Sequence, residues 1–277
     1  MATFESVQSN SVDSGDLVIT KPVGLAVGDE MFAGIAFSND NGAGGAVTTP
    51  AGWTEEDRET LPGAVGLELV IFTKTADSSD VAASNFTFTS TGFGDYGLAG
   101  FIARLSDPGS IVGSSSNNAD GSSATITTTT FTPTKADTLF LGVLMHINPT
   151  AQNNVSVALA TDNPTWTEQT EESANLPNRD VSIALYTGTR AAATATGTIT
   201  GTISGAVIGR AIAVYSYSDR VNGAVTPTTK VNAYAFNPVN PTATVNALVD
   251  DITTASRDVT DWTNETKPST TWVNDTL

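Results

Sequence analysis

The chain has 277 residues, of which 39% are hydrophobic and only 15% are charged, and acidic residues outnumber basic ones 29 to 12. The resulting formal net charge of -17 argues against nucleic acid as a partner, because phosphate binding needs clustered Lys and Arg. There is no Cys, and His146 is the only His, so disulfide frameworks, zinc–thiolate sites and His-pair metal motifs are excluded. We therefore expect no enzymatic activity, no catalytic residues, no cofactor and no metal site.

We expect neither a secretory signal nor a membrane span from the sequence. The segment Met1–Glu5 has no basic region followed by an apolar one, as a secretory signal would need. No stretch approaches the roughly 18 apolar residues of a membrane span, so we expect no membrane association. The composition, rich in Thr, Ser, Ala, Gly and Asn, is nevertheless typical of exposed extracellular β proteins. An external type of composition without an export signal favours a location in a virus particle.

An internal duplication organises the first 220 residues. Four blocks recur in the same order, with offsets of 108, 113, 114 and 112 residues: Asp29–Phe37 with Asp137–Met145, Trp53–Glu55 with Trp166–Glu168, Leu69–Thr73 with Ile183–Thr187, and Ala103–Asp107 with Tyr215–Asp219. The small drifts are those that loop insertions would produce. The sequence therefore predicts two copies of one fold.

Each copy is predicted to consist of strands. Met31–Phe37 and Leu139–Met145 are continuous apolar runs, as expected of central strands buried on both faces. Leu67, Leu69 and Ile71 alternate with Glu68 and Val70 in a pattern typical of a half-buried strand. Phe86–Thr89 and Thr196–Thr200 are further strand candidates because of their aromatic and β-branched content.

The number and spacing of these strands predict the fold class. About seven short strands in roughly 105–110 residues are typical of a β-sandwich. We therefore predict an all-β protein of two tandem antiparallel sandwiches, Ig-like or jelly-roll in connectivity, over residues 1–108 and 109–220. Residues 221–277 are predicted to form an extended C-terminal arm or small docking region, because prolines interrupt this polar segment.

Two residue types recur within the copies. Gly34 and Gly142 fall inside the same predicted strand, where either close packing against a neighbouring strand or a β-bulge would require glycine. Trp53 and Trp166 each follow a loop, and two interpretations remain open for them. They pack against the protein, or they offer an aromatic platform for a glycan or a partner.

Polar residues with catalytic potential give little support to a reaction. His146 is expected to be a hydrogen-bonded histidine at a strand end, aligned with Ser38 of the first copy. The carboxylates of Glu55, Glu56 and Asp57, with Glu168 in the second copy, resemble the pair that a glycosidase needs. We expect these acids to be solvated, which makes a carbohydrate-active enzyme the weakest hypothesis.

The C-terminal segment contains a second, shorter repeat. Trp262–Thr266 and Trp272–Thr276 recur with a period of ten, separated by Lys267, Pro268 and Ser269. The two tryptophans either fold back on the sandwiches or dock into a partner. Regularly spaced Trp anchors suit interface pockets, so the candidate interface residues are Trp262, Lys267, Pro268 and Trp272.

The turn Pro50–Thr54, the apolar strand before it and the Thr-rich strands after it resemble β-sandwich modules of structural proteins in tailed viruses of bacteria and archaea. The ending from Trp262 to Trp272 also resembles terminal segments of head and tail proteins of such viruses. The resemblance implies a particle-associated structural role at the head, the neck or the tail, and it brings no catalytic residues.

The function expected from these observations is a non-enzymatic virion protein that decorates or stabilises a capsid through its C-terminal arm. The expected partners are other virion proteins, namely the major capsid protein or tail components, and further copies of the chain, as in a trimer. The alternative is a tail, baseplate or fibre protein that binds a receptor or glycan as an adhesin. The acidic excess either keeps an arrayed surface protein soluble or marks a high-salt environment.

Overall fold

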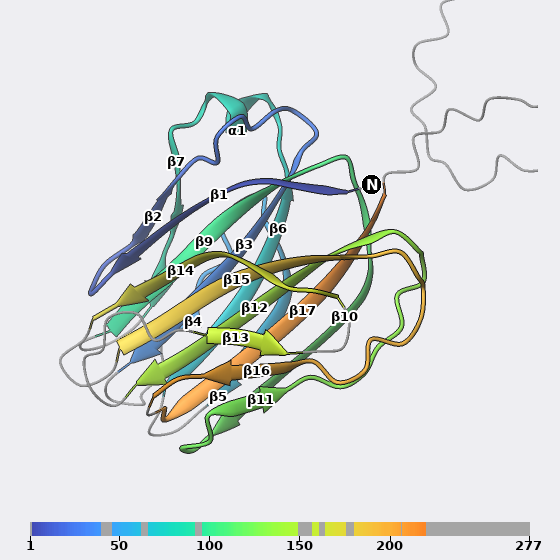
Figure 1. The fold of residues 1–277 in the computed structure, drawn as a ribbon. Helices are drawn as coiled ribbons and strands as arrows, with labels where there is room; N and C mark the ends of the chain where they lie inside the picture. Colours follow the sequence, from blue (N-terminus) through green and yellow to red (C-terminus); the bar gives the residue numbers. More distant parts are fainter. Residues whose placement is uncertain are drawn as a thin grey trace, which may run out of the picture. The chain divides into compact units, whose positions relative to one another are not determined.

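The structure of the chain is a computed structural model that describes residues 2–39, 46–61, 66–91, 96–148, 157–160, 164–175, 180–205 and 207–219. Its regular structure is β strand, apart from one short helix within this described part (Figure 1). The chain divides into two compact units, residues 1–220 and residues 221–277, and the second unit lies outside the described residues. The predicted all-β class, built from two sets of antiparallel strands, is confirmed.

Half 1 of the body consists of strands β1 to β9 and helix α1. Its elements are β1 (Thr3–Val12), β2 (Leu17–Thr20), β3 (Glu30–Asn39), β4 (Ala46–Val47), β5 (Thr54–Leu61), β6 (Leu67–Thr75), α1 (Ser78–Ala82), β7 (Asn85–Phe88), β8 (Ser90–Thr91) and β9 (Tyr96–Ser106). Five of the strands form its main sheet in the order β1-β9-β3-β6-β5, while β2 pairs with β7 and β4 with β8.

Half 2 consists of strands β10 to β17. These are β10 (Pro108–Asp120), β11 (Thr125–Thr127), β12 (Thr138–Asn148), β13 (Val157–Ala160), β14 (Thr167–Ala174), β15 (Asp180–Arg190), β16 (Thr200–Ile203) and β17 (Gly209–Asp219). Its main sheet has the order β10-β17-β12-β15-β14, and β11, β16 and β13 form a smaller sheet. Each strand of one main sheet has a counterpart in the other at the same place, so the predicted duplication is confirmed.

The duplication extends to irregularities of the backbone. In half 1 the pairing of β5 with β6 shifts between Glu55 and Asp57, which marks a β-bulge. In half 2 the pairing of β14 with β15 shifts between Glu168 and Thr170, at the equivalent position. Because a bulge re-aims the residues that follow it, its presence in both halves keeps β5 and β14 pointing the same side chains toward the same faces.

The strand register corrects the predicted alignment of the first block by one residue. Leu105 pairs with Glu30 in half 1, and its equivalent Tyr217 pairs with Leu139 in half 2, so Glu30 rather than Met31 corresponds to Leu139. A shift by one residue exchanges the two faces of a strand. The counterpart of Gly34 is therefore Val143, not Gly142.

The two glycines consequently meet different surroundings. A methyl group added to Gly34 would lie 2.7 Å from the Phe101 ring and 3.3 Å from Ile183 of half 2, whereas one added to Gly142 would lie 2.4 Å from Leu159 and 3.0 Å from Trp166. The predicted reason, close packing, is confirmed at both positions. The predicted equivalence of the two positions is wrong.

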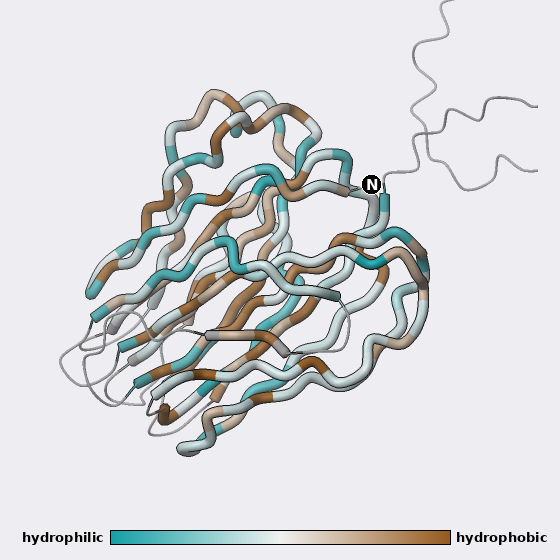
Figure 2. The backbone as a smooth tube through the Cα atoms, in the orientation of Figure 1, coloured by the Kyte–Doolittle hydropathy of each residue, from teal (hydrophilic) through white to brown (hydrophobic). Residues whose placement is uncertain are grey.

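The main sheets of the two halves pack face to face and share one core. Its buried residues come from both halves and include Phe32, Ile71, Phe101, Val143 and Tyr217. Phe32 of β3 contacts the ring of Tyr215 with centroids 5.5 Å apart. Figure 2 shows hydrophobic residues along the strands of both sheets. The sequence predicted two tandem sandwiches, and in the structure their main sheets also form a sandwich with each other.

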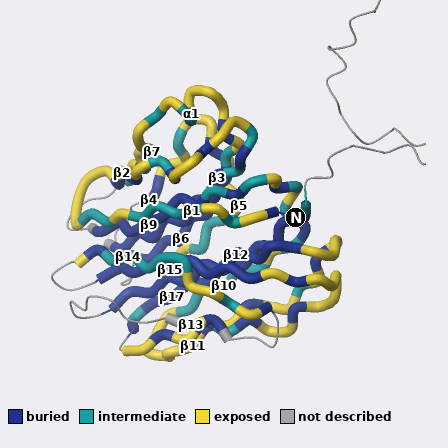
Figure 3. Tube along the Cα trace, turned by 45° about the horizontal axis from the view of Figure 1, so that its top comes forward, coloured by how far each residue is buried: buried dark blue, intermediate teal, exposed yellow. Residues whose placement is uncertain are grey.

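Each main sheet also carries an outer layer with its own core. In half 1 the strands β2, β4 and β7 cover residues such as Ile35 and Phe72. In half 2 the sheet β11-β16-β13 covers Phe140 and Leu144. The exposed residues lie mostly on these outer layers and their loops, while β3, β6, β12 and β15 are buried (Figure 3). The central strands are thus buried on both faces, as predicted for Met31–Phe37 and Leu139–Met145.

Two local predictions differ from the structure, and one element was not predicted. Leu67–Ile71 is fully buried rather than half-buried, because both faces of β6 are covered. The strand expected at Thr196–Thr200 begins only at Thr200. Helix α1 was not predicted, although Asp77 and Asp80 form a capping box that marks its start.

Candidate functional site

The candidate interface residues of the C-terminal arm are Trp262, Lys267, Pro268 and Trp272. All four lie outside the described residues. Their role in docking therefore stays a prediction.

The two tryptophans of the body pack against protein. Trp53 is 8% exposed, and its ring meets the edges of Phe86 and Phe88 with centroids 5.9 and 5.4 Å away. Trp166 is half-buried and meets Phe140 at 6.3 Å. A glycan platform needs an exposed ring face, and the packing of Trp53 leaves little of one.

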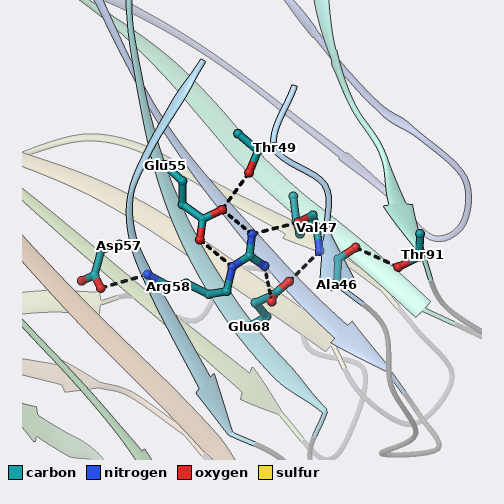
Figure 4. A network of polar contacts seen from close by, with 8 residues as sticks. All are labelled: Ala46, Val47, Thr49, Glu55, Asp57, Arg58, Glu68 and Thr91. Atoms are coloured by element: carbon teal, nitrogen blue, oxygen red, sulfur yellow. Dashed lines mark hydrogen bonds and ion pairs between the residues drawn. The ribbon is translucent and has the colours of Figure 1, made fainter. Parts of the chain in front are cut away.

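A cluster of connected polar side chains surrounds Arg58 on the outer face of half 1 (Figure 4). Its guanidinium group donates to both oxygens of Glu55, through Nε at 2.8 Å and Nη2 at 2.7 Å. It also forms an ion pair with Glu68, whose side chain is only 5% exposed. One arginine thus balances two carboxylates, one half-exposed and one buried.

The same cluster holds the short strand β4 on the sheet. Arg58 Nη2 donates to the carbonyl oxygen of Val47 at 2.9 Å, and the amide of Val47 donates to Glu68 at 2.6 Å. The hydroxyl of Thr49, two residues after β4, donates to Glu55 at 2.7 Å, so this part of the chain is held by the same cluster (Figure 4). The ion pair therefore fixes the edge of the outer layer of half 1.

The charges of the cluster stabilise one another. Hydrogen bonding to Arg58 lowers the pKa of Glu55, although partial burial opposes the shift. The hydrogen bond to Glu55 raises the pKa of Arg58 well above its ordinary value, with Glu68 adding to the effect and burial opposing it. Both groups stay charged across the physiological pH range, so neither suits proton transfer near neutral pH.

The equivalent positions in half 2 hold different groups. Strand pairing aligns Glu55 with Glu168 and Arg58 with Glu171, while Glu68 aligns with Ser182. Burial, reinforced by the nearby Glu168, raises the pKa of Glu171 to about 7. Its Oε1 atom is buried and has no hydrogen-bond partner among the described residues. Half 2 thus carries an acid where half 1 carries its arginine.

His146 lies on the outer face of the same sheet. It is 1% exposed, sits beside Ser182 on β15 and Arg210 on β17, and corresponds to Phe37 rather than to Ser38. Burial lowers its pKa to about 4, so the ring is neutral near pH 7. Neither ring nitrogen has a hydrogen-bond partner within the described part of the chain. The expectation of a hydrogen-bonded histidine is therefore wrong.

Two of the remaining predicted carboxylates accept hydrogen bonds from hydroxyl groups on a neighbouring strand. Glu56 accepts a hydrogen bond from Thr73 at 2.6 Å, and Glu168 accepts one from Tyr186 at 3.1 Å. Across the described ranges, no group of three or more His, Cys, Asp or Glu residues could hold a metal ion. In the same ranges no helix is long and apolar enough to cross a membrane.

Comparisons with protein-family models, with curated proteins and with solved structures found no match to this chain. The sequence did not single out Arg58 or Glu68, whose side chains meet across neighbouring strands. The available signal was Glu68 within the otherwise apolar run Leu67–Phe72. If that run is buried on both faces, its carboxylate requires a partner.

Proposed function

We propose that this chain is a non-enzymatic structural component of a virus particle, a protein that decorates or stabilises a capsid and docks through residues 221–277. The single observation that carries the proposal is the shared core of the two halves. A chain without cysteine cannot use disulfides to stay folded outside a cell, so its stability must come from buried apolar surface. Three stacked cores provide that surface.

The placement of the reactive side chains supports a structural role. Arg58 and Glu68 hold a strand in place, and His146 is buried without access to solvent. A general acid or base must reach its substrate within hydrogen-bond distance. These groups are therefore used for folding, which favours a scaffold over an enzyme.

The charge of the chain supports an arrayed surface protein. A net charge of -17 keeps many copies at high local density from associating non-specifically. Specific docking then needs a concentrated apolar anchor, and the Trp262 and Trp272 repeat supplies one in the sequence. We assign docking to this repeat and rigidity to the body.

The first test is quantitative mass spectrometry of gradient-purified particles from the source system. We expect copies in a simple ratio to the major capsid protein. A few copies to some dozens per particle would move the protein to the neck, tail or fibres. Absence from the particles would overturn the proposal.

The second test removes residues 258–277 or replaces both tryptophans, as Trp262→Ala with Trp272→Ala. We expect loss of particle attachment with unchanged thermal stability of the body. The matched control is Thr263→Ala with Thr271→Ala, which alters the same segment but keeps the aromatic anchors. Full attachment of the tryptophan variant would contradict the assignment of docking to the arm.

A further inference from the structure

The contact between the two halves has a two-fold character. Along one seam, Ser9 and Ser11 of β1 donate to Glu172 of β14 at 3.1 and 2.8 Å. Along the other seam, Asn118 of β10 donates to Glu59 of β5. Strand pairing makes Ser11 equivalent to Asn118 and Glu172 equivalent to Glu59. The two seams are therefore two copies of one contact.

The core between the seams follows the same relation. Leu69 and Ile71 of half 1 and their equivalents Ile183 and Leu185 of half 2 all point into it. Each half thus presents equivalent strands to the other, with matching aliphatic residues at these positions, and this arrangement has the pseudo-two-fold relation of an isologous homodimer interface. A surface of this kind pairs equally well when its partner belongs to another molecule.

The connection between the halves is a single residue. β9 ends at Ser106 and β10 begins at Pro108, so only Asp107 separates them. Asp107 has φ +47, a left-handed conformation that costs energy for a residue with a side chain, although less for Asp and Asn than for other residues. Its repeat equivalent, Asp219, still lies within β17, so the unfavourable conformation belongs to the connection and not to the repeat.

Pro108, the residue after Asp107, adds to this strain. A residue before proline favours the extended region of the backbone, which would join β9 and β10 into one continuous strand. Opening at Asp107 therefore relieves strain, while pairing with another molecule restores every contact between halves. Short strained connections of this kind promote exchange of identical elements between chains.

We propose that two copies of this chain exchange halves through a hinge at Asp107, so that half 1 of each copy packs on half 2 of the other. The partner is a second copy of this chain, and the interface is the shared core with its two seams. The inference does not rest on the proposed function, because it concerns the body alone.

A disulfide across one seam tests the exchange in the full chain. The hydroxyl of Thr170 donates to that of Ser9 at 3.1 Å, so Ser9→Cys with Thr170→Cys places two thiols within bonding reach. The chain has no native cysteine to interfere. After refolding and oxidation, a denaturing gel without reductant separates an intrachain bond, which gives a single chain, from an interchain bond, which gives a covalent dimer.

We expect covalent dimers whose share rises with the protein concentration during refolding, matched by light scattering of the same samples. Ser9→Cys alone is the control for disulfides formed by chance contact, and it should give few dimers. Only intrachain bonds at every concentration would overturn the proposal. Free thiols in every sample would overturn it as well, because the seam itself would then be absent.

A second variant tests the hinge. Asp107→Gly accepts the left-handed conformation without strain, so we expect the dimer share to fall several-fold. Asp137→Gly is the matched control, because Asp137 has φ +50 but lies outside the connection. Equal effects of the two variants, or no effect of Asp107→Gly, would contradict the role of the hinge.

Discussion

On the outer face of half 1 an arginine lies between two carboxylates, whereas the equivalent face of half 2 carries two carboxylates and a neutral histidine. The backbones that present these groups share strand order, register and a bulge. Half 1 therefore uses a compensated ion network, whereas in the described part of half 2 the Oε1 atom of Glu171 and both ring nitrogens of His146 have no hydrogen-bond partner. The comparison shows that a duplicated fold keeps its strand geometry while its polar contacts change.

The inner faces of the two halves keep aliphatic residues at two pairs of equivalent positions on β6 and β15, although other inner positions, such as Gly34 and Val143, differ. Leu69 and Ile183 are both buried in the shared core, and so are Ile71 and Leu185. An inner residue must fit the other half as well as its own sheet, so a change there disturbs two surfaces. An outer residue meets only its own outer layer, and one local partner is enough to accommodate a change.

Replacing Arg58 is expected to change the free energy of unfolding more than any other substitution on the outer faces. Arg58→Met would leave the buried Glu68 without its cation, and we expect a loss of about 3 kcal/mol in the free energy of unfolding. Urea denaturation near pH 7 measures it. The double variant Arg58→Met with Glu68→Gln removes the stranded charge and should recover much of the loss. If the single variant kept full stability, the network would have no structural role.

Replacing the histidine by its half 1 counterpart should change the pH dependence of stability. The folded-state pKa of His146 is about 4, below its ordinary value of 6.5, so the unfolded chain binds a proton first as the pH falls. The stability advantage of His146→Phe over the parent should therefore grow between pH 6.5 and pH 4, by about 3 kcal/mol. Parallel stability curves for the two proteins would contradict the burial of a neutral ring.

The two strand glycines compare the inner and outer faces directly. Gly34→Ala forces a methyl group against Phe101 and Ile183 between two packed sheets, and we expect a loss of about 2 kcal/mol. Gly142→Ala meets the end of the Leu159 side chain at the margin of the smaller outer layer, where we expect a loss of roughly half that size. Thermal unfolding of the two variants measures both losses of stability. A larger loss for Gly142→Ala than for Gly34→Ala would refute the assignment of faces.

The sequence allowed the prediction of the strands, the duplication and the all-β class, because apolar runs such as Met31–Phe37 determine burial directly. It did not allow the prediction that the halves share a core. A strand that is apolar at every position does not indicate which face meets which partner. For the same reason the alignment of Met31 with Leu139 was one residue out of register.

The polar contacts could not be predicted from the sequence for a different reason. Arg58 and Glu68 are ten residues apart in the sequence and meet only because β5 pairs with β6. The sequence pattern around His146 predicted a strand end, but its missing hydrogen-bond partners depend on which residues occupy β15 and β17 beside it. Contacts between strands of this kind follow from register, which the hydrophobic pattern alone did not specify.

Neutralising the acid that replaces the arginine should have the smallest effect. The folded-state pKa of Glu171 is about 7, above its ordinary value of 4.5, so the folded protein loses stability as the pH rises from 4.5 to 7. Glu171→Gln lacks this loss. At pH 8 the free energy of unfolding of Glu171→Gln should exceed that of the parent by about 1–2 kcal/mol, and near pH 4 the two should be equal. The expected difference is reduced because the side chain is half-exposed and solvent screens its charge.

The neighbouring Glu172 provides the matched control for this change. It accepts hydrogen bonds from Ser9 and Ser11 across the seam, so Glu172→Gln should lower stability at pH 8 rather than raise it. Denaturant unfolding of the three proteins at pH 4 and pH 8 separates the outcomes. Equal stability of Glu171→Gln and the parent at both pH values would mean that half 2 compensates its acid as fully as half 1 does. The contrast between the outer faces would then be one of sequence and not of energy.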